Sequence, residues 1–388
     1  MSGTPIGLYV HLPWCVRKCP YCDFNSYEAR GVLAEQVYVD ALLRDLDTEL
    51  QRMAPPAIGS VFIGGGTPSL FSAKAIGRLL AGLRARTDFV DDIEITLEAN
   101  PGSAETARFR GYIEAGVNRL SLGIQSFDPV QLTRLGRVHD ANEAHGAIAM
   151  ARAAGCTNLN LDLMFGLPEA APGDSLRDLE QAIAHGPEHI SWYQLTLEEG
   201  TAFARQPPAL PEHDQICDDY EAGLALLASA GYQQYEISAY ARGARAARHN
   251  LNYWLFGDYI GIGAGAHGKR TDAAGTVWRT ARIRHPERYL KAAWKGLAID
   301  SEERVAGMTL ATEFMLNALR LATGFDTALF VARTGLPLTR LHAPLEVALA
   351  RGWLEHHGER LRPTMQGFRF LNDLQLLFTG LDEQPAAA

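Results

Sequence analysis

Short apolar stretches alternate with longer amphipathic stretches over the first 240 residues of the chain. The short stretches predict strands, and the longer ones repeat apolar positions at helical spacing. Strand and helix alternating in this order favour parallel strands joined by right-handed crossovers. The predicted strands are 7–12, 60–63, 93–98, 119–123, 158–164 and 190–195. The predicted helices are 34–53, 73–86, 104–115, 129–135, 141–154, 175–184 and 213–230.

Six such units are too few for a closed barrel, which has eight. We therefore predict an α/β fold with an open partial (β/α)6 barrel over residues 1–240. In barrels of this kind, reacting groups collect at the carboxyl ends of the strands. The polar and glycine residues of this chain fall there: the cysteine-containing loop after the first strand, three glycines after the second, and Glu98, Gln125 and Asp162 at or near the ends of the next three.

The pattern changes after residue 240. Residues 241–300 form a polar connector, in which the stretch 259–268 is so rich in glycine that its backbone must pass close to another part of the chain. Residues 301–388 form a smaller α+β unit. Its predicted elements are helices at 309–321, 326–334 and 339–352 and a hairpin of 360–362 with 367–370. Three helices and a β-hairpin indicate a winged-helix-like domain.

Composition and charge narrow the classes of function. The chain of 388 residues is 47% hydrophobic and 21% charged, which is typical of globular proteins. No apolar run approaches the ~20 residues of a membrane span, and residues 1–14 lack the regions of a signal peptide. We expect a cytoplasmic protein whose membrane contact, where it has any, is peripheral. The net charge of −9 argues against nucleic acid as a partner, since neutralising phosphates needs a basic surface.

Three cysteines, Cys15, Cys19 and Cys22, lie on the loop after the first predicted strand. A zinc site or a fully protein-ligated cluster has four protein ligands, but Phe24 occupies the place of a fourth thiol. Three thiolates on a four-iron cubane leave one iron open to a small chelating molecule. The alternatives are a disulfide pair, which the missing signal peptide disfavours, and a zinc knuckle with His11, which lacks a second pair of ligands.

The other two cysteines, Cys156 and Cys217, lie in apolar helix or strand patterns. We predict that both are buried free thiols. A reducing cytoplasm suits all five cysteines.

The cysteine spacing resembles the signature of the radical S-adenosylmethionine (SAM) superfamily, in which SAM caps the open iron and the reduced cluster cleaves it. Further motifs lie at residues 8–15, 64–69, 97–101, 121–127, 162–168 and 249–254. Together these motifs resemble the oxygen-independent coproporphyrinogen III oxidase family, and within it the HemW branch of haem chaperones. The resemblance runs over essentially the whole chain and implies a radical SAM partial barrel.

The resemblance implies that the three cysteines hold a [4Fe-4S] cluster. It implies that Glu98 and Asp162 accept hydrogen bonds from the amine or ribose hydroxyls of SAM, and that Arg137 pairs with its carboxylate. The residues it assigns to SAM are Tyr9, Gly65, Gly66, Thr67, Glu98, Gln125, Arg137 and Asp162. Taken singly, each polar residue fits an ordinary salt bridge as well, and the glycine turn fits a tight connection.

The same resemblance assigns His249, Asn250, Tyr253 and Trp254 to haem binding. An imidazole can ligate haem iron, and the two aromatic rings offer flat apolar faces to a porphyrin. Two arginines nearby, Arg245 and Arg248, would meet the propionates if they face the same way. The alternative is a structural histidine that caps a turn beside two core aromatic residues.

Two departures separate this chain from the true oxidases of the family. Phe24 stands in the place of their extra cysteine, and this chain reaches Cys15 almost at once, whereas the oxidases have an N-terminal extension ahead of the motif. Our leading hypothesis is a haem carrier that uses a SAM-capped cluster to regulate or drive haem delivery to acceptor proteins such as respiratory cytochromes, with homodimerisation as an additional expectation. Whether it is also an enzyme that cleaves SAM stays open. One alternative is a radical SAM oxidoreductase acting on a porphyrinogen. Another is a structural cluster protein that binds neither SAM nor haem.

Overall fold

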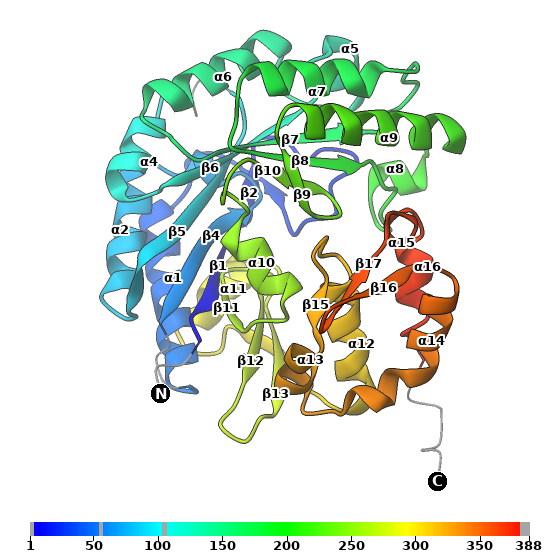
Figure 1. The fold of residues 1–388 in the computed structure, drawn as a ribbon. Helices are drawn as coiled ribbons and strands as arrows, with labels where there is room; N and C mark the ends of the chain where they lie inside the picture. Colours follow the sequence, from blue (N-terminus) through cyan, green and yellow to red (C-terminus); the bar gives the residue numbers. More distant parts are fainter. Residues whose placement is uncertain (1–3, 54–56, 103–106, 381–388) are drawn as a thin grey trace.

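The computed structural model describes residues 4–53, 57–102 and 107–380. Six parallel strands pair in the order of the sequence, and this confirms the predicted partial barrel. They are β1 (Ile6–Leu12), β4 (Ile58–Gly65), β5 (Phe89–Ala99), β6 (Arg119–Gln125), β7 (Leu159–Phe165) and β8 (His189–Gln194). Figure 1 shows them curving round a common interior.

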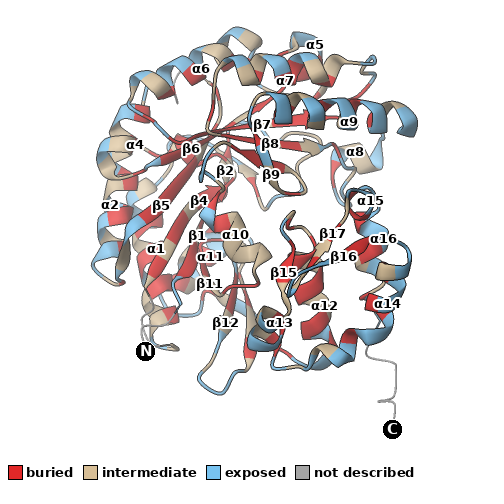
Figure 2. Cartoon of the chain, viewed as in Figure 1, coloured by how far each residue is buried: buried red, intermediate tan, exposed pale blue. Residues whose placement is uncertain are grey.

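Helices cover the outer side of this sheet, as Figure 1 shows, and Figure 2 shows their outer faces exposed while the strands are buried. They are α1 (Glu35–Leu50), α2 (Ala73–Arg84), α4 (Phe109–Ala115), α5 (Pro129–Arg134), α6 (Ala141–Ala153), α7 (Asp174–Ala184) and α9 (His213–Ser229), with the short α8 (Ala202–Arg205) before α9. Side-chain caps fix several starts, such as the Asp140 capping box of α6. Residues 104–106 of the predicted helix 104–115 lie outside the described residues.

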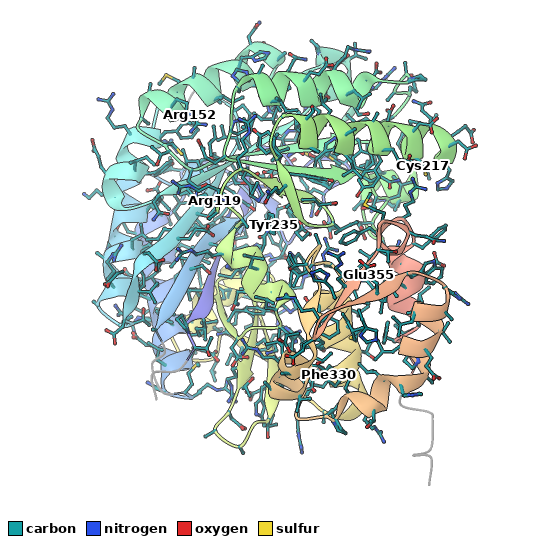
Figure 3. All side chains as sticks on the ribbon, in the orientation of Figure 1. Arg119, Arg152, Cys217, Tyr235, Phe330 and Glu355 are labelled. Carbon is teal, nitrogen blue, oxygen red and sulfur yellow. The ribbon has the colours of Figure 1, made fainter. Side chains whose placement is uncertain are left out.

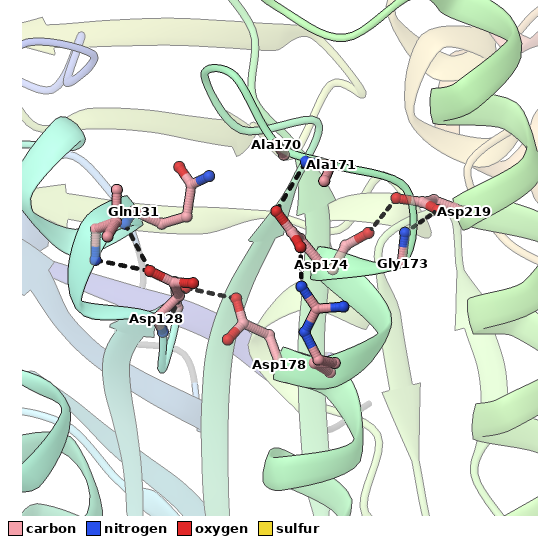
Figure 4. A network of polar contacts seen from close by, with 12 residues as sticks. Asp128, Gln131, Ala170, Ala171, Gly173, Asp174, Asp178 and Asp219 are labelled. Atoms are coloured by element: carbon pink, nitrogen blue, oxygen red, sulfur yellow. Dashed lines mark hydrogen bonds and ion pairs between the residues drawn. The ribbon is translucent and has the colours of Figure 1, made fainter.

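Hydrogen-bonded carboxylates fix the loops that follow β6 and β7. Asp128 caps α5 by accepting from the backbone of Val130 and Gln131, while Asp178 accepts from Ser126 and from the Phe127 backbone. Figure 4 shows this network together with Asp174 at the start of α7 and Asp219 of α9, which accept from the backbone of Ala171 and Gly173 in the loop after β7. The loops at the carboxyl end of the barrel are therefore held by the helices behind them.

The sheet continues beyond the six units at both edges. The antiparallel strands β10 (Ala239–Ala241) and β9 (Gln233–Glu236) follow β8, while β11 (Tyr259–Ile262) lies parallel to β1. Antiparallel strands β12 (His267–Thr271), β13 (Val277–Arg282) and β14 (Ile299–Val305) extend that second edge, and α11 (Pro286–Ala293) packs against α1. A Cβ on Gly261 would lie 1.8 Å from the His267 carbonyl oxygen, so the predicted close approach of the glycine-rich backbone is confirmed.

A buried charge cluster joins these added strands to α1. Arg282 of β13 donates to Asp45 at 3.0 Å and to Glu49 at 2.5 Å, and all three side chains are buried. Tyr289 of α11 also donates to Asp45. The cluster fixes the added strands at a defined position against the barrel.

The C-terminal unit contains the three predicted helices, α12 (Gly307–Ala318), α13 (Thr327–Thr334) and α14 (His342–Ala350). Its hairpin differs from the prediction: β16 (Leu354–His357) pairs with β17 (Arg360–Pro363), and β15 (Phe325–Asp326) joins them. Residues 367–370, predicted as a strand, fall in and just after α15 (Met365–Arg369), because Thr364 caps that helix; α16 (Leu371–Leu376) follows.

No helix of the described part of the chain is both long and apolar enough to cross a membrane.

Candidate functional site

A cavity of about 330 Å³ opens at the carboxyl ends of the barrel strands, within the size range of small-molecule sites. It brings together most of the residues that the sequence singled out. Those lining it are Cys15, Cys19, Cys22, Gly65, Gly66, Thr67, Glu98, Gln125, Arg137, Asp162 and Asn250. We call it the main cavity.

The cysteine loop is anchored at both of its ends. Its first and last residues pair as the short parallel strands β2 (Trp14–Cys15) and β3 (Tyr27–Glu28). Asn25 donates to the carbonyl oxygens of Ala264 and Arg284, each at 2.9 Å. The loop is therefore held to the distant β11–β13 edge of the sheet.

The three thiols of this loop are free, and burial raises the pKa of Cys15 to about 11. Arg137 lies beside them, with its Nη1 3.6 Å from the Cys19 Sγ. In the described part of the chain, no three His, Cys, Asp or Glu side chains converge closely enough to hold one metal ion. The loop thus presents three separate thiols to the main cavity, with the Arg137 guanidinium beside them.

The glycine turn after β4 packs directly against the cysteine loop. Gly65 has a positive φ of 117°, which favours glycine, and a Cβ on Gly66 would lie 2.5 Å from the Trp14 carbonyl oxygen. The Thr67 backbone donates to that same oxygen at 2.7 Å. Larger residues here would push the two cavity walls apart.

Two carboxylates face the main cavity without an ion-pair partner among the described residues. Glu98 accepts from the Gly65 backbone at 3.2 Å, and burial, followed by the charge of Asp162, raises the pKa of Glu98 to about 8. Asp162 accepts from Ser121 and Asn160, and burial raises its pKa as well. This wall of the cavity suits a ligand that carries positive charge or several hydrogen-bond donors.

Two further residues that line the main cavity, Gln125 and Arg137, are held in fixed orientations. Gln125 has a φ of 70°, unusual for a residue with a side chain, and its Oε1 accepts from the Tyr193 hydroxyl at 2.8 Å. Arg137 donates to the Asn100 side chain at 2.5 Å and to the Gly123 carbonyl at 2.7 Å. Backbone strain of this kind collects at functional sites.

Tyr9 does not line the main cavity. Its ring packs beside those of Phe62 and His249, with centroids 6.2 Å away in each case, and its hydroxyl hydrogen-bonds with His11 Nδ1 at 2.9 Å. His11 Nε2 lies 2.8 Å from the Asn25 carbonyl oxygen. Tyr9 thus connects the barrel interior to the cysteine loop.

The four predicted haem residues lie on helix α10 (Arg248–Trp254) and face different surroundings. His249 is only 3% exposed and stacks on Phe62 at 4.8 Å. Asn250 faces the main cavity. Tyr253 and Trp254 line a second cavity of about 190 Å³, on the side of the C-terminal unit. This second cavity is smaller than most small-molecule sites.

Neither arginine before this motif faces the main cavity. Arg248 pairs with Asp92 at 2.5 Å on the outer surface, and Arg245 is exposed. Of the remaining cysteines, Cys156 is buried as predicted. The prediction for Cys217 is wrong: it is exposed on α9, where Figure 3 labels it.

Arg119 is a residue of the main cavity that sequence reasoning missed. It is 2% exposed, and Figure 3 shows it in the barrel interior, near Tyr235. The period of β6 could have identified it, because Arg119 shares a strand face with Ser121 and Gln125.

Comparison with known proteins agrees with this geometry. Residues 9–182 match the family model of the radical SAM superfamily, and residues 308–370 match that of the HemN C-terminal domain. The chain is 46% identical over 378 residues to the heme chaperone HemW of Haemophilus influenzae, which covers 96% of this chain and 98% of that protein. Identity to the heme chaperone HemW of Escherichia coli is 46% over 374 residues, with the same coverage of each chain.

One solved structure is similar over nearly the whole chain. It is coproporphyrinogen III oxidase (HemN) from Escherichia coli, a radical SAM enzyme. The TM-score is 0.81 at 22% identity, covering 97% of this chain and 90% of that one. At this identity the likeness concerns the fold alone.

Proposed function

The chain belongs to the HemW family of haem chaperones in the radical SAM superfamily, and from this premise we propose that it binds haem and delivers it to acceptor proteins. The observation that carries the proposal is the 46% identity to two bacterial haem chaperones over 96% of the chain. We further propose that respiratory cytochromes are among the acceptors.

The cysteine loop supports a [4Fe-4S] cluster held by Cys15, Cys19 and Cys22. Three separate thiols without a fourth leave one coordination position for a small molecule. The Arg137 guanidinium beside Cys19 would stabilise the negative charge of a thiolate-ligated cluster. When bound, the cluster with SAM supplies one-electron chemistry.

The part of the main cavity formed by Glu98 and Asp162 supports SAM as that small molecule. SAM carries a sulfonium cation, an amine and ribose hydroxyls, and Glu98 and Asp162 offer acceptors that lack an ion-pair partner among the described residues. The Gly65–Gly66 backbone can approach a ligand closely because no side chain intervenes. We propose that Gln125, Arg137, Thr67 and, from behind the cavity wall, Tyr9 complete this site.

For haem we propose that α10 contributes through His249, Asn250, Tyr253 and Trp254. Asn250 faces the main cavity, while Tyr253 and Trp254 line the second cavity, which touches the C-terminal unit. Neither cavity is large enough to enclose a porphyrin together with SAM, so the macrocycle would lie across an open side. Arg320 of the C-terminal unit stacks over Trp254 at 4.3 Å, and haem binding there would engage that contact.

The alternative function is oxidation of a porphyrinogen by the same barrel. The fold likeness to the oxidase allows it, but Phe24, 58% exposed at the rim of the main cavity, stands where the oxidases have their extra cysteine. We therefore propose a carrier and leave SAM cleavage as an activity to be measured. We also propose a cytoplasmic location, with peripheral membrane contact during transfer, and a homodimer.

One experiment separates the two functions. Cluster-reconstituted protein is titrated anaerobically with haem, and the same sample is then assayed for conversion of coproporphyrinogen III to protoporphyrinogen IX. Stoichiometric haem binding without turnover is the expected result. Turnover with weak haem binding would reassign the chain as an oxidase.

A further inference from the structure

Three buried polar atoms of the barrel interior, one of them on a residue that lines the main cavity, have no hydrogen-bond partner among the described residues. They are Thr96 Oγ1, Arg119 Nε and His249 Nε2. Thr96 and Arg119 are direct neighbours across β5 and β6, so their side chains lie on the same face of the sheet. We call these three residues the cavity floor.

His249 lies within electrostatic reach of Arg119. Burial, followed by the Arg119 charge, lowers the pKa of His249 to about 3, so the ring is neutral. Its Nδ1 lies 3.4 Å from the Ser60 hydroxyl. With Nδ1 accepting from Ser60, Nε2 carries the proton and is a free donor.

Arg119 is the member of the floor that most requires a partner. Its side chain is 2% exposed and lines the main cavity, and its Nε has no hydrogen-bond partner within the described ranges. Its charge acts on the Glu98 and Asp162 carboxyls of the same cavity and opposes the rise of their pKa, but no salt bridge among the described residues includes it. Buried arginines are almost always paired, since removing a charge from water without compensation is costly. A buried guanidinium aimed into a cavity is therefore suited to an anion that a ligand brings.

The floor lies deeper in the barrel than Glu98, at the level of Phe62 and Tyr9 in the strand register. Thr96 precedes Glu98 by two residues on β5, which places it about 7 Å further from the carboxyl end of the strand. A ligand group that reaches the floor can therefore bind while Glu98 contacts another molecule. Asn250, the residue after His249, lines the main cavity.

We propose that Thr96, Arg119 and His249 form a receptor for a carboxylate, and that a propionate of haem occupies it. The Arg119 guanidinium, the Thr96 hydroxyl and the His249 imidazole then all donate to one carboxylate group. A planar guanidinium suits a carboxylate because it can donate two parallel hydrogen bonds to it. A macrocycle is too wide to reach His249, which is 3% exposed, but a propionate arm is narrow. His249 thus binds haem through the propionate and does not ligate the iron. This inference rests on the haem binding of the proposed function.

The test compares haem with haem dimethyl ester, whose propionates carry no charge. Dissociation constants of both are measured anaerobically on cluster-reconstituted protein with saturating SAM. Wild-type protein should bind haem about tenfold or more tightly than the ester, the range for hydrogen bonds to a charged group. Arg119→Met should bind both about equally at saturating SAM, while Arg177→Met, a change at a surface arginine outside the cavity, should keep the wild-type preference.

Two further variants keep the test decisive if Arg119→Met fails to fold. Thr96→Val replaces a hydroxyl without a partner by a methyl group of the same shape and should reduce the preference several-fold. His249→Gln should reduce it while the haem absorption maximum stays in place. A wild-type preference in Thr96→Val and Arg119→Met, or a shifted maximum in His249→Gln, would overturn the inference.

The remaining outcomes separate this inference from the proposed function. Wild-type protein that binds haem and ester equally refutes the carboxylate receptor alone. Wild-type protein that binds neither refutes haem binding itself, and the receptor with it. A loss of SAM affinity in Arg119→Met, with the haem preference intact, assigns Arg119 to SAM and also overturns the inference.

Discussion

Replacing Glu98 by Gln is expected to remove most of the pH dependence of SAM binding. Burial and the nearby charge of Asp162 raise the pKa of Glu98 to about 8, so in the ligand-free cavity this carboxyl is mostly protonated at pH 7. The sulfonium cation of SAM favours the ionised form. Binding must then release the proton, and affinity must rise with pH until the carboxyl ionises by itself.

The size of the effect follows from the shifted pKa. Ionising Glu98 costs about 1.4 kcal/mol at pH 7 and about 2.7 kcal/mol at pH 6. The wild-type dissociation constant for SAM should therefore fall roughly tenfold from pH 6 to 7, fivefold from pH 7 to 8, and little above pH 9. Glu98 is partly open to the cavity, where water screens its charge, so these values are upper bounds.

Proton release gives a direct assay. Calorimetric titrations of cluster-loaded protein with SAM at pH 7, in buffers of different ionisation enthalpy, should give about 0.9 proton released by wild type and almost none by Glu98→Gln. Asp162→Asn is the matched control: removing its charge lowers the pKa of Glu98, so the dependence should move to lower pH and persist. Equal proton release by wild type and Glu98→Gln would refute this reasoning.

Three further changes test other parts of the structure. Cys19→Ser should abolish iron loading and keep the far-ultraviolet circular dichroism, while the exposed Cys217→Ser should load normally; a full four-iron spectrum in Cys19→Ser would exclude the proposed ligands. Arg282→Met leaves two buried carboxylates without their cation and should cost about 3–5 kcal/mol in urea unfolding; an unchanged midpoint would contradict the buried cluster. Gly223→Ala would set a Cβ 2.0 Å from the Trp192 ring, so it should lower stability by about 1–3 kcal/mol, outweighing the helix preference of alanine; a more stable variant would show that the ring moves aside.

The six parallel strands could be predicted because each shows its own local pattern of apolar residues. The pairing of β11 with β1 could not, because it joins residues about 250 positions apart and nothing local encodes it. The second strand of the hairpin predicted in the C-terminal unit was misplaced for a different reason. Phe368 and Phe370 alternate with polar residues as in a strand, but Thr364 three residues before Gly367 is a helix-cap signal that should have been weighed more heavily.

The main cavity could be anticipated because parallel strands bring their carboxyl ends to one edge. Side-chain direction was the part that the sequence did not reveal. Helix α10 sends Asn250 to one cavity and Trp254 to another, and the motif alone gives no sign of that division. Arg119 escaped notice because an arginine at the start of a strand is usually a surface residue, and only its position on the inner face of the partial barrel makes it a buried one.

The anchoring of the cysteine loop has a consequence for the order of events during synthesis. Asn25, three residues after Cys22, depends on carbonyl groups of Ala264 and Arg284, which leave the ribosome some 240–260 residues later. Until then β1 also lacks its neighbour β11. The cysteine loop therefore lacks these anchors for most of translation, and the proposed cluster would meet the loop in its final conformation only when about three-quarters of the chain has been made.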